Sequence, residues 1–153
     1  MTDALDDAGL DDLARSVDGW LEALRDAYDH VAAVDRSPDE LHRWFVRMRG
    51  EEKDVTTVWL TLGQRTLRYE TYVMPAPEEN AETLYEHLLR RNDRLVGAHF
   101  SIGVEDAIFL RGELPVGQVS LDELDRVLGT LYAHVEQCFR ALLHLGFACR
   151  FAD

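Results

Sequence analysis

The pattern of apolar and polar positions switches between the period of a helix and that of a strand. From Leu10 to about Val34, apolar residues recur every three or four positions, which predicts an amphipathic helix. Asp6 or Asp7 is its expected N-cap. Residues 37–40 (SPDE) form a capping box with Pro at the first helical position, which predicts one short helical turn.

Strict alternation replaces this period between Arg43 and Met74 and predicts three consecutive antiparallel strands. Gly63-Gln64 is typical of a two-residue hairpin turn, which would place Leu60 opposite Leu67. Alternation on the first strand places Trp44 opposite Leu60. One face of these strands is apolar, and a slip of one residue would turn it to water, so we predict that it faces the core. Its residues are Trp44, Val46, Met48, Val58, Leu60, Leu67, Tyr69 and Val73.

The opposite face of the same strands mixes aromatic and cationic side chains. In the predicted register its cross-strand rows are Phe45–Trp59–Arg68, Arg47–Thr57–Glu70 and Arg49–Val55–Tyr72. Such a face is typical of the solvent-exposed side of an antiparallel sheet, or of a surface covered by a helix. Aromatic residues and Arg are, however, the types enriched at the hot spots of protein interfaces. The candidate partner-binding residues are therefore Phe45, Arg47, Trp59, Arg68 and Tyr72.

The remainder of the chain predicts four more elements. These are a helix over about 78–91, strands over 96–104 and 108–114, and a last helix. The last helix begins at the capping box of Ser120, and Gly146 is the expected residue just after its end. The sequence predicts one α+β domain over residues 1–153. Its elements follow in the order α-β-β-β-α-β-β-α, with helices flanking an antiparallel sheet.

Charge narrows the functional classes. The net charge is −13, and residues 1–42 hold twelve acidic residues against three Arg. This excludes nucleic acid as a partner, because phosphate binding needs clustered Lys and Arg. The start of the chain lacks the features of a signal peptide, and no stretch approaches the ~18 apolar residues of a membrane span. We expect a cytoplasmic protein with no membrane partner. Lys53 is its only lysine, which indicates a GC-rich bacterial genome.

No sequence motif of catalysis or of cofactor binding is present, whether GxSxG, GxxxxGK[ST], GxGxxG or HExxH. His134 and Cys138 are one helical turn apart, but two ligands are too few for a metal, and Cys138 lies on an apolar stripe. The predicted register pairs Glu70 with Arg47, which favours a structural ion pair over a general acid. We therefore expect a protein that is not an enzyme, with no catalytic residue, no cofactor and no metal.

Three stretches carry a resemblance to a known family. They are LRYETYVMP (67–75), LLRRNDRLVGAHFSI (88–102) and AIFLRGELPVGQVSLDELDRVLGTLYAHVEQCFRAL (107–142). With the order of elements, they resemble the YbjN-like proteins, which are grouped with the type III secretion chaperones of the CesT/SycE kind. The resemblance implies an antiparallel sheet with flanking helices, often in a dimer. It also implies a peptide-binding chaperone or a regulatory module, since some members are labelled sensory transduction regulators, and it brings no catalytic residue.

The functional hypothesis is a non-enzymatic module that binds a protein or peptide client as a homodimer. The alternative is a small-molecule sensor or enzyme with a pocket between the sheet and the helices, which would contain His99 or Glu70. A third possibility is an oligomerisation domain without a ligand. The apolar stripes of the first and last helices could pack on the sheet or on a second subunit, and a two-fold dimer is the commonest small assembly.

Overall fold

The structure is a computed structural model that describes residues 4–152. Its centre is one antiparallel sheet of six strands in the order β1-β2-β3-β4-β6-β5. The strands are β1 (Val31–Arg36), β2 (Arg43–Arg49), β3 (Val55–Leu62), β4 (Thr66–Met74), β5 (His99–Ile102) and β6 (Ile108–Pro115). The helices are α1 (Asp7–Ala27), α2 (Ala81–Asn92) and α3 (Leu121–Gly146). Three short 3-10 turns are η1 (Val104–Asp106), η2 (Val116–Gln118) and η3 (Ala148–Arg150). The predicted α+β class is confirmed.

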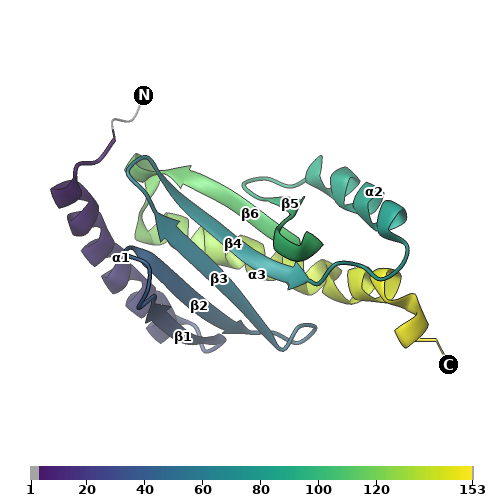
Figure 1. The fold of residues 1–153 in the computed structure, drawn as a ribbon. Coiled ribbons are helices and arrows are strands. Elements are labelled where there is room, and N and C mark those ends of the chain that lie inside the picture. Colours follow the sequence, from purple (N-terminus) through teal and green to yellow (C-terminus); the bar gives the residue numbers. More distant parts are fainter. Residues whose placement is uncertain (1–3, 153) are drawn as a thin grey trace.

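Helices α1 and α3 lie on one face of the sheet, and α2 lies beyond its β5 end (Figure 1). The predicted core face is confirmed, since each of its eight residues has at most 2% of its surface exposed. Trp44 is fixed further, because its indole Nε1 donates a hydrogen bond of 2.6 Å to Asp18 on α1. Both expected N-caps are present: Asp6 accepts from Gly9 N in α1, and Ser120 accepts from Glu123 N in α3.

The sheet contains one strand more than the sequence pattern indicates. The first helix ends at Ala27 instead of about Val34, and β1 follows it and pairs with β2, Val34 lying opposite Val46. The prediction was wrong because Val31 is buried in either structure, so its spacing from Leu24 fits a helix and a strand equally. The element order is therefore α-β-β-β-β-α-β-β-α.

Residues 38–40 form a bend that leads into a turn at residues 41–42, and the helical turn predicted at 37–40 is absent. The Ser37 hydroxyl does accept hydrogen bonds from the amides of Asp39 and Glu40, which is the N-cap half of a capping box. The chain then returns at once, because Ser37 N donates to Arg43 O and extends the β1–β2 ladder. The capping pattern thus closes a hairpin here.

The pairing of β2 with β3 is confirmed, with Trp44 opposite Leu60 and Phe45 opposite Trp59. The pairing of β3 with β4 differs by two residues: Leu60 lies opposite Tyr69, not Leu67. A slip of two keeps every side chain on its face, so alternation alone could not detect it. The longer hairpin presents the carbonyls of Gln64 and Arg65, which accept from the amides of Leu5 and Val116.

Two details around α2 and α3 also differ from the prediction. Strand β5 spans four residues instead of nine, and the Asn92 side chain forms hydrogen bonds with both the N–H and the C=O of Phe100 at its outer edge. Gly146 is the last residue of α3, not the residue beyond it. A Cβ there would lie 2.9 Å from Met74 Cε, so glycine permits close packing at this position.

Candidate functional site

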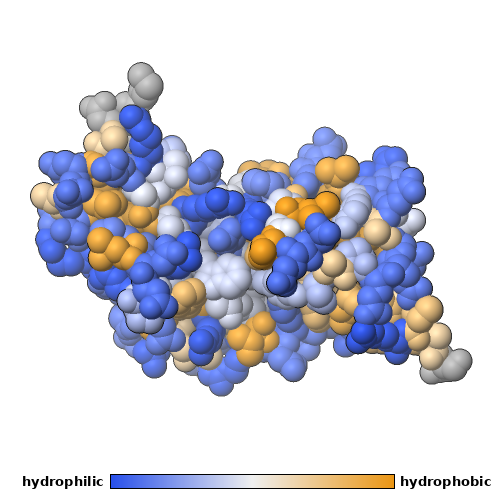
Figure 2. Space-filling model, in the orientation of Figure 1, coloured by the Kyte–Doolittle hydropathy of each residue, from blue (hydrophilic) through white to orange (hydrophobic). Residues whose placement is uncertain are grey.

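The candidate site is the face of the sheet opposite α1 and α3, which we call the open face (Figure 1). One cross-strand row runs over all six strands, and its residues are Asp35, Phe45, Trp59, Glu70, Arg111 and His99. In Figure 2 residues of intermediate hydropathy fill the middle of this face, and a hydrophobic patch lies beside its β5 end. Exposed Ile102 and Val104 belong to that end. The row joins residues that are 76 positions apart in sequence, Asp35 and Arg111.

Phe109 of β6 forms the buried base of an aromatic cluster on the open face. Its ring is 5.7 Å from that of Tyr72 in an edge-to-face arrangement and 6.2 Å from that of Trp59. The guanidinium of Arg111 covers it at 4.3 Å. Only 4% of Phe109 is exposed, and a Cβ on Gly103 would lie 2.4 Å from its ring. The cluster is therefore held rigidly, with Tyr72 and Trp59 as its accessible members.

An ion-pair network lies beside the cluster. Arg111 Nε donates to Glu70 Oε2 at 2.8 Å, and Arg68 Nε lies 3.7 Å from the same oxygen. Arg111 also donates to the Ser101 hydroxyl at 3.1 Å. About a fifth of each side chain in the Arg111–Glu70 pair is exposed. Glu70 thus forms structural ion pairs, as expected. Its partners are Arg68 and Arg111, however, and not the predicted Arg47.

In each predicted cross-strand row, the pair between β2 and β3 is correct and the residue assigned to β4 is wrong. Phe45 and Trp59 are adjacent and half-buried, but Trp59 faces Glu70, and Arg68 faces Thr61. Arg47 and Arg68 are exposed, and Tyr72 lies opposite Phe109. The structure therefore places all five predicted residues on one face, in different rows from those predicted.

The sequence reasoning missed the contribution of β5 and β6. Phe109 and Arg111 alternate with buried Ile108 and Leu110, so the pattern already indicates that they share a face. That β6 pairs with β4 could not be derived from the pattern, because the crossover through α2 places β5 at the edge. His99 opens onto a surface hollow of about 570 Å³ that Arg68 and Arg111 also line.

Lys53 borders the open face from the β2–β3 loop. Its Nζ donates to the carbonyl of Tyr72 at 2.5 Å and lies 5.3 Å and 5.6 Å from the ring centres of Tyr72 and Phe139. These contacts favour the ammonium form, yet burial outweighs them and lowers the pKa of Lys53 to about 8. The loop is held from the other side by Glu136, which accepts from the amides of Glu51 and Glu52.

Within residues 4–152, no three His, Cys, Asp or Glu side chains converge as metal ligands. Cys138 is buried in the core, and burial raises the pKa of its thiol to about 11.

The helices of the described chain are all too short or too polar to cross a membrane.

Comparisons with known proteins identify the family of the chain. A family model named YbjN, described as "Putative bacterial sensory transduction regulator", matches residues 33–144. The chain is 36% identical over 127 residues to an uncharacterised protein of Mycobacterium leprae, covering 83% of this chain and 67% of that one. It is 34% identical over 140 residues to an uncharacterised protein of Mycobacterium tuberculosis strain H37Rv, covering 92% and 75%.

A solved structure shows the same fold at low sequence identity. It is the heterodimeric ExoU–SpcU complex from the type III secretion system of Pseudomonas aeruginosa. One chain of it aligns with a TM-score of 0.57 and 14% identity, over 82% of this chain and 96% of its own length. The expected relation in fold to type III secretion proteins is confirmed. By its sequence, the chain belongs to the YbjN family.

Proposed function

We propose that the chain is a non-enzymatic protein-binding module, chaperone-like or regulatory, of the bacterial cytoplasm. The observation that carries the proposal is the open face, on which Trp59 and Tyr72 are accessible over a rigid base. The family description as a regulator and the occurrence of the fold in a heterodimeric complex support a role in binding. On this account the face holds an extended segment of a protein partner.

The exposed arginines define the chemistry of that segment. Arg47 forms no ion pair within residues 4–152, and Arg68 has only the 3.7 Å contact with Glu70, so both guanidinium groups can donate to a partner. Between them lie the rings of Phe45 and Trp59. A segment with apolar side chains next to carboxylates or carbonyls fits this arrangement, because Arg binds such oxygens with two parallel hydrogen bonds.

Quantitative affinity capture from the native host tests the proposal. Trp59→Ala combined with Arg47→Ala should reduce the recovery of the specific partner about tenfold or more, as loss of hot-spot residues does. Phe151→Ala combined with Arg25→Ala removes one aromatic residue and one arginine outside the open face and should leave recovery unchanged. If both double variants, folded to the same melting temperature, recover every partner equally, the open face is not the binding surface.

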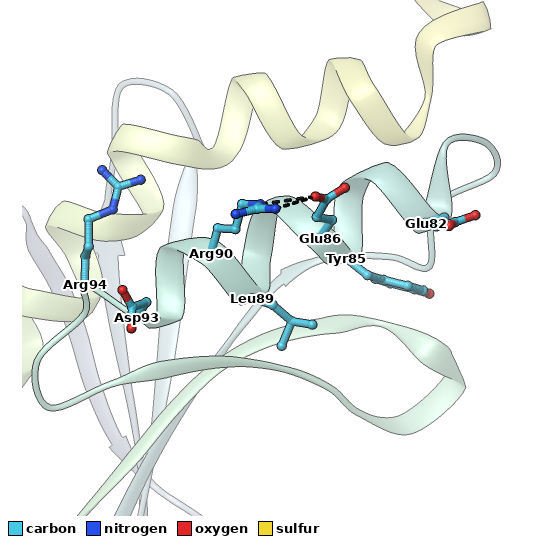
Figure 3. A pocket seen from close by; sticks show the side chains of 7 residues that line it. All are labelled: Glu82, Tyr85, Glu86, Leu89, Arg90, Asp93 and Arg94. Carbon is cyan, nitrogen blue, oxygen red and sulfur yellow. Dashed lines mark hydrogen bonds and ion pairs between the residues drawn. The ribbon is translucent and has the colours of Figure 1, made fainter.

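We further infer that two copies associate through α2. An apolar groove of about 390 Å³ runs between α2 and β5, and its lining includes Tyr85, Leu88, Leu89, Phe100 and Ile102. Leu89 is 69% exposed and Ile102 is 50% exposed. Figure 3 shows Leu89 pointing away from the helix, between Tyr85 and Asp93. Exposed apolar residues grouped around one helix are typical of an interface.

Charges on α2 favour a second copy as the occupant of this groove. Glu82 and Glu86 lie in the first half of α2, and Arg90 and Arg94 lie at and just beyond its end (Figure 3). When two such helices pack antiparallel about a two-fold axis near Leu89, the acidic half of each faces the basic half of the other. A two-fold interface has to be self-complementary in this way.

Sedimentation measurements test the dimer. Leu89→Asp should give a monomer, because it places two carboxylates at the two-fold axis. Leu41→Asp is the matched control, since Leu41 is 78% exposed in the β1–β2 turn far from α2. A wild-type monomer at micromolar concentration, or equal effects of the two substitutions, would exclude α2 as the interface.

A further inference from the structure

A second hollow lies apart from the open face, between the end of α2 and the middle of α3. It has a volume of about 190 Å³ and is lined by Arg91, Arg94, Leu95, His134 and Gln137. Figure 3 shows the side chain of Arg94 extending from the end of α2 toward α3. We call this the Arg91–His134 pocket. Every polar group in its lining donates hydrogen bonds or can become a cation, apart from the Gln137 carbonyl.

The pocket carries positive charge without a balancing carboxylate, although the molecule as a whole is acidic. The net charge is −13, and ten arginines form ion pairs with carboxylates. Within residues 4–152, Arg91 and Arg94 form none, although Asp93 is their neighbour in sequence. No carboxylate lines the pocket. Two guanidinium groups therefore converge where the protein supplies no counter-charge.

Burial and the local charge both act on His134. Burial and the nearby Arg91 guanidinium lower the pKa of His134 below its ordinary value. Cys138, one turn further along α3, supplies no thiolate, because burial keeps its pKa at about 11. The titratable and charged groups around the imidazole are therefore Arg91, Arg94 and the neutral Cys138. Positive charge at His134 is disfavoured until an anion arrives.

We propose that the Arg91–His134 pocket binds an oxyanion of the phosphate type. Arg91 and Arg94 supply paired N–H donors, which match the geometry of phosphate oxygens. Gln137 supplies an amide donor, and the imidazole of His134 adds a further donor. Leu95 offers an apolar wall to the organic part of a phosphate ester. The ligand is an inorganic oxyanion or a small phosphate ester.

NMR titration of the His134 imidazole tests the proposal with the full chain. Sulfate is the first probe, because it keeps its charge from pH 5 to 8, and sodium chloride at equal ionic strength is the reference. Anion binding should raise the pKa of His134 relative to chloride. By linkage, sulfate should then bind more tightly as the pH falls through that interval. An unchanged pKa in saturating sulfate would overturn the proposal.

Variants locate the anion. Arg91→Gln should raise the dissociation constant for sulfate about tenfold or more, since a hydrogen bond to a charged group contributes that much. It should also raise the pKa of His134 in chloride, because Arg91 lowers it. Arg25→Gln is the control, because Arg25 forms an ion pair with Glu22 on α1 and lies outside both the pocket and α2. An equal loss of sulfate affinity in both variants would show that binding depends on the net charge alone, and it would contradict the proposed site.

Two further probes identify the source of the anion. Inorganic phosphate and phenyl phosphate are titrated at one pH under the same conditions. Tighter binding of phenyl phosphate, with shifts at Leu95, supports a phosphate ester as the ligand. Equal affinity supports an inorganic oxyanion. Binding of either probe that persists in the Arg91→Gln, Arg94→Gln double variant overturns the proposal.

Discussion

At the scale of single residues, burial has a larger effect on the pKa of Lys53 than its neighbouring groups have. Lys53 has two aromatic rings and a carbonyl within reach, and the loss of water still lowers its pKa to about 8. Phe109 points to the outer face of the sheet and is nevertheless 4% exposed, because Arg111 and Gly103 cover it. Alternation in sequence predicts the face on which a side chain lies. Its exposure depends on neighbours from distant strands.

The pKa of Lys53 can be measured directly, because Lys53 is the only lysine. Reductive methylation with carbon-13 and NMR titration should give a value of about 8, against an ordinary ~10.4. Between those two pH values the unfolded chain binds more protons than the folded one. The free energy of unfolding of the wild type, relative to Lys53→Met, should therefore rise with pH over that window. A titration near the ordinary value would show that the side chain is hydrated.

Two glycines should respond in opposite directions to alanine. Gly112 lies opposite Tyr69, and a Cβ there would be 2.4 Å from the Tyr69 ring and 2.5 Å from the Gly97 carbonyl. Gly112→Ala should therefore reduce the free energy of unfolding by about 1–3 kcal/mol. Gly19 is exposed within α1 with nothing within 4 Å of its Cβ position, so Gly19→Ala should add about 0.5–1 kcal/mol. Urea unfolding measures both, and equal effects would contradict the packing around Tyr69.

At the scale of elements, hydrophobic periodicity was sufficient to predict an element whose apolar pattern is long and regular. The stripe of α3 and the Ser120 cap predicted a helix whose start is confirmed, and β2 and β3 have the predicted register. The pattern failed where two structures bury the same residues. Val31 is buried in a helix or in a strand, and a slip of two leaves Leu67 and Tyr69 on the core face. The pairing with neighbouring strands determines both the strand at Val31 and the register of β4. This pairing cannot be derived from the apolar pattern of a single sequence.

Asn92 joins two elements, since its side chain occupies the outer N–H and C=O of Phe100. Phe100 is 5% exposed, so removal of this side chain leaves buried polar groups without a partner. Asn92→Ala should cost about 1–3 kcal/mol of unfolding free energy. It should also speed hydrogen exchange at the Phe100 amide. Asn92→Asp keeps the acceptor and should preserve the protection of that amide, whereas equal exchange in both variants would contradict the role of the side chain.

At the scale of the whole molecule, charge and shape separate three surfaces. The acidic residues gather in the first 42 positions, and the open face carries arginines in a segment of zero net charge. The α2 groove is apolar, and the Arg91–His134 pocket is cationic. The partner on the open face and the oxyanion therefore use different residues, whereas Arg94 belongs to both the proposed α2 interface and the pocket.

The partner-binding role of the open face is the central claim, and site-specific photo-crosslinking in the native host tests it most directly. Benzoylphenylalanine replaces Thr57, which faces Arg47 in the centre of the open face, or Ala133, which is exposed on α3. Irradiation should join the Thr57 position covalently to a discrete partner and leave the Ala133 position without that adduct. Adducts of equal yield at both positions, or none at Thr57, would contradict the account.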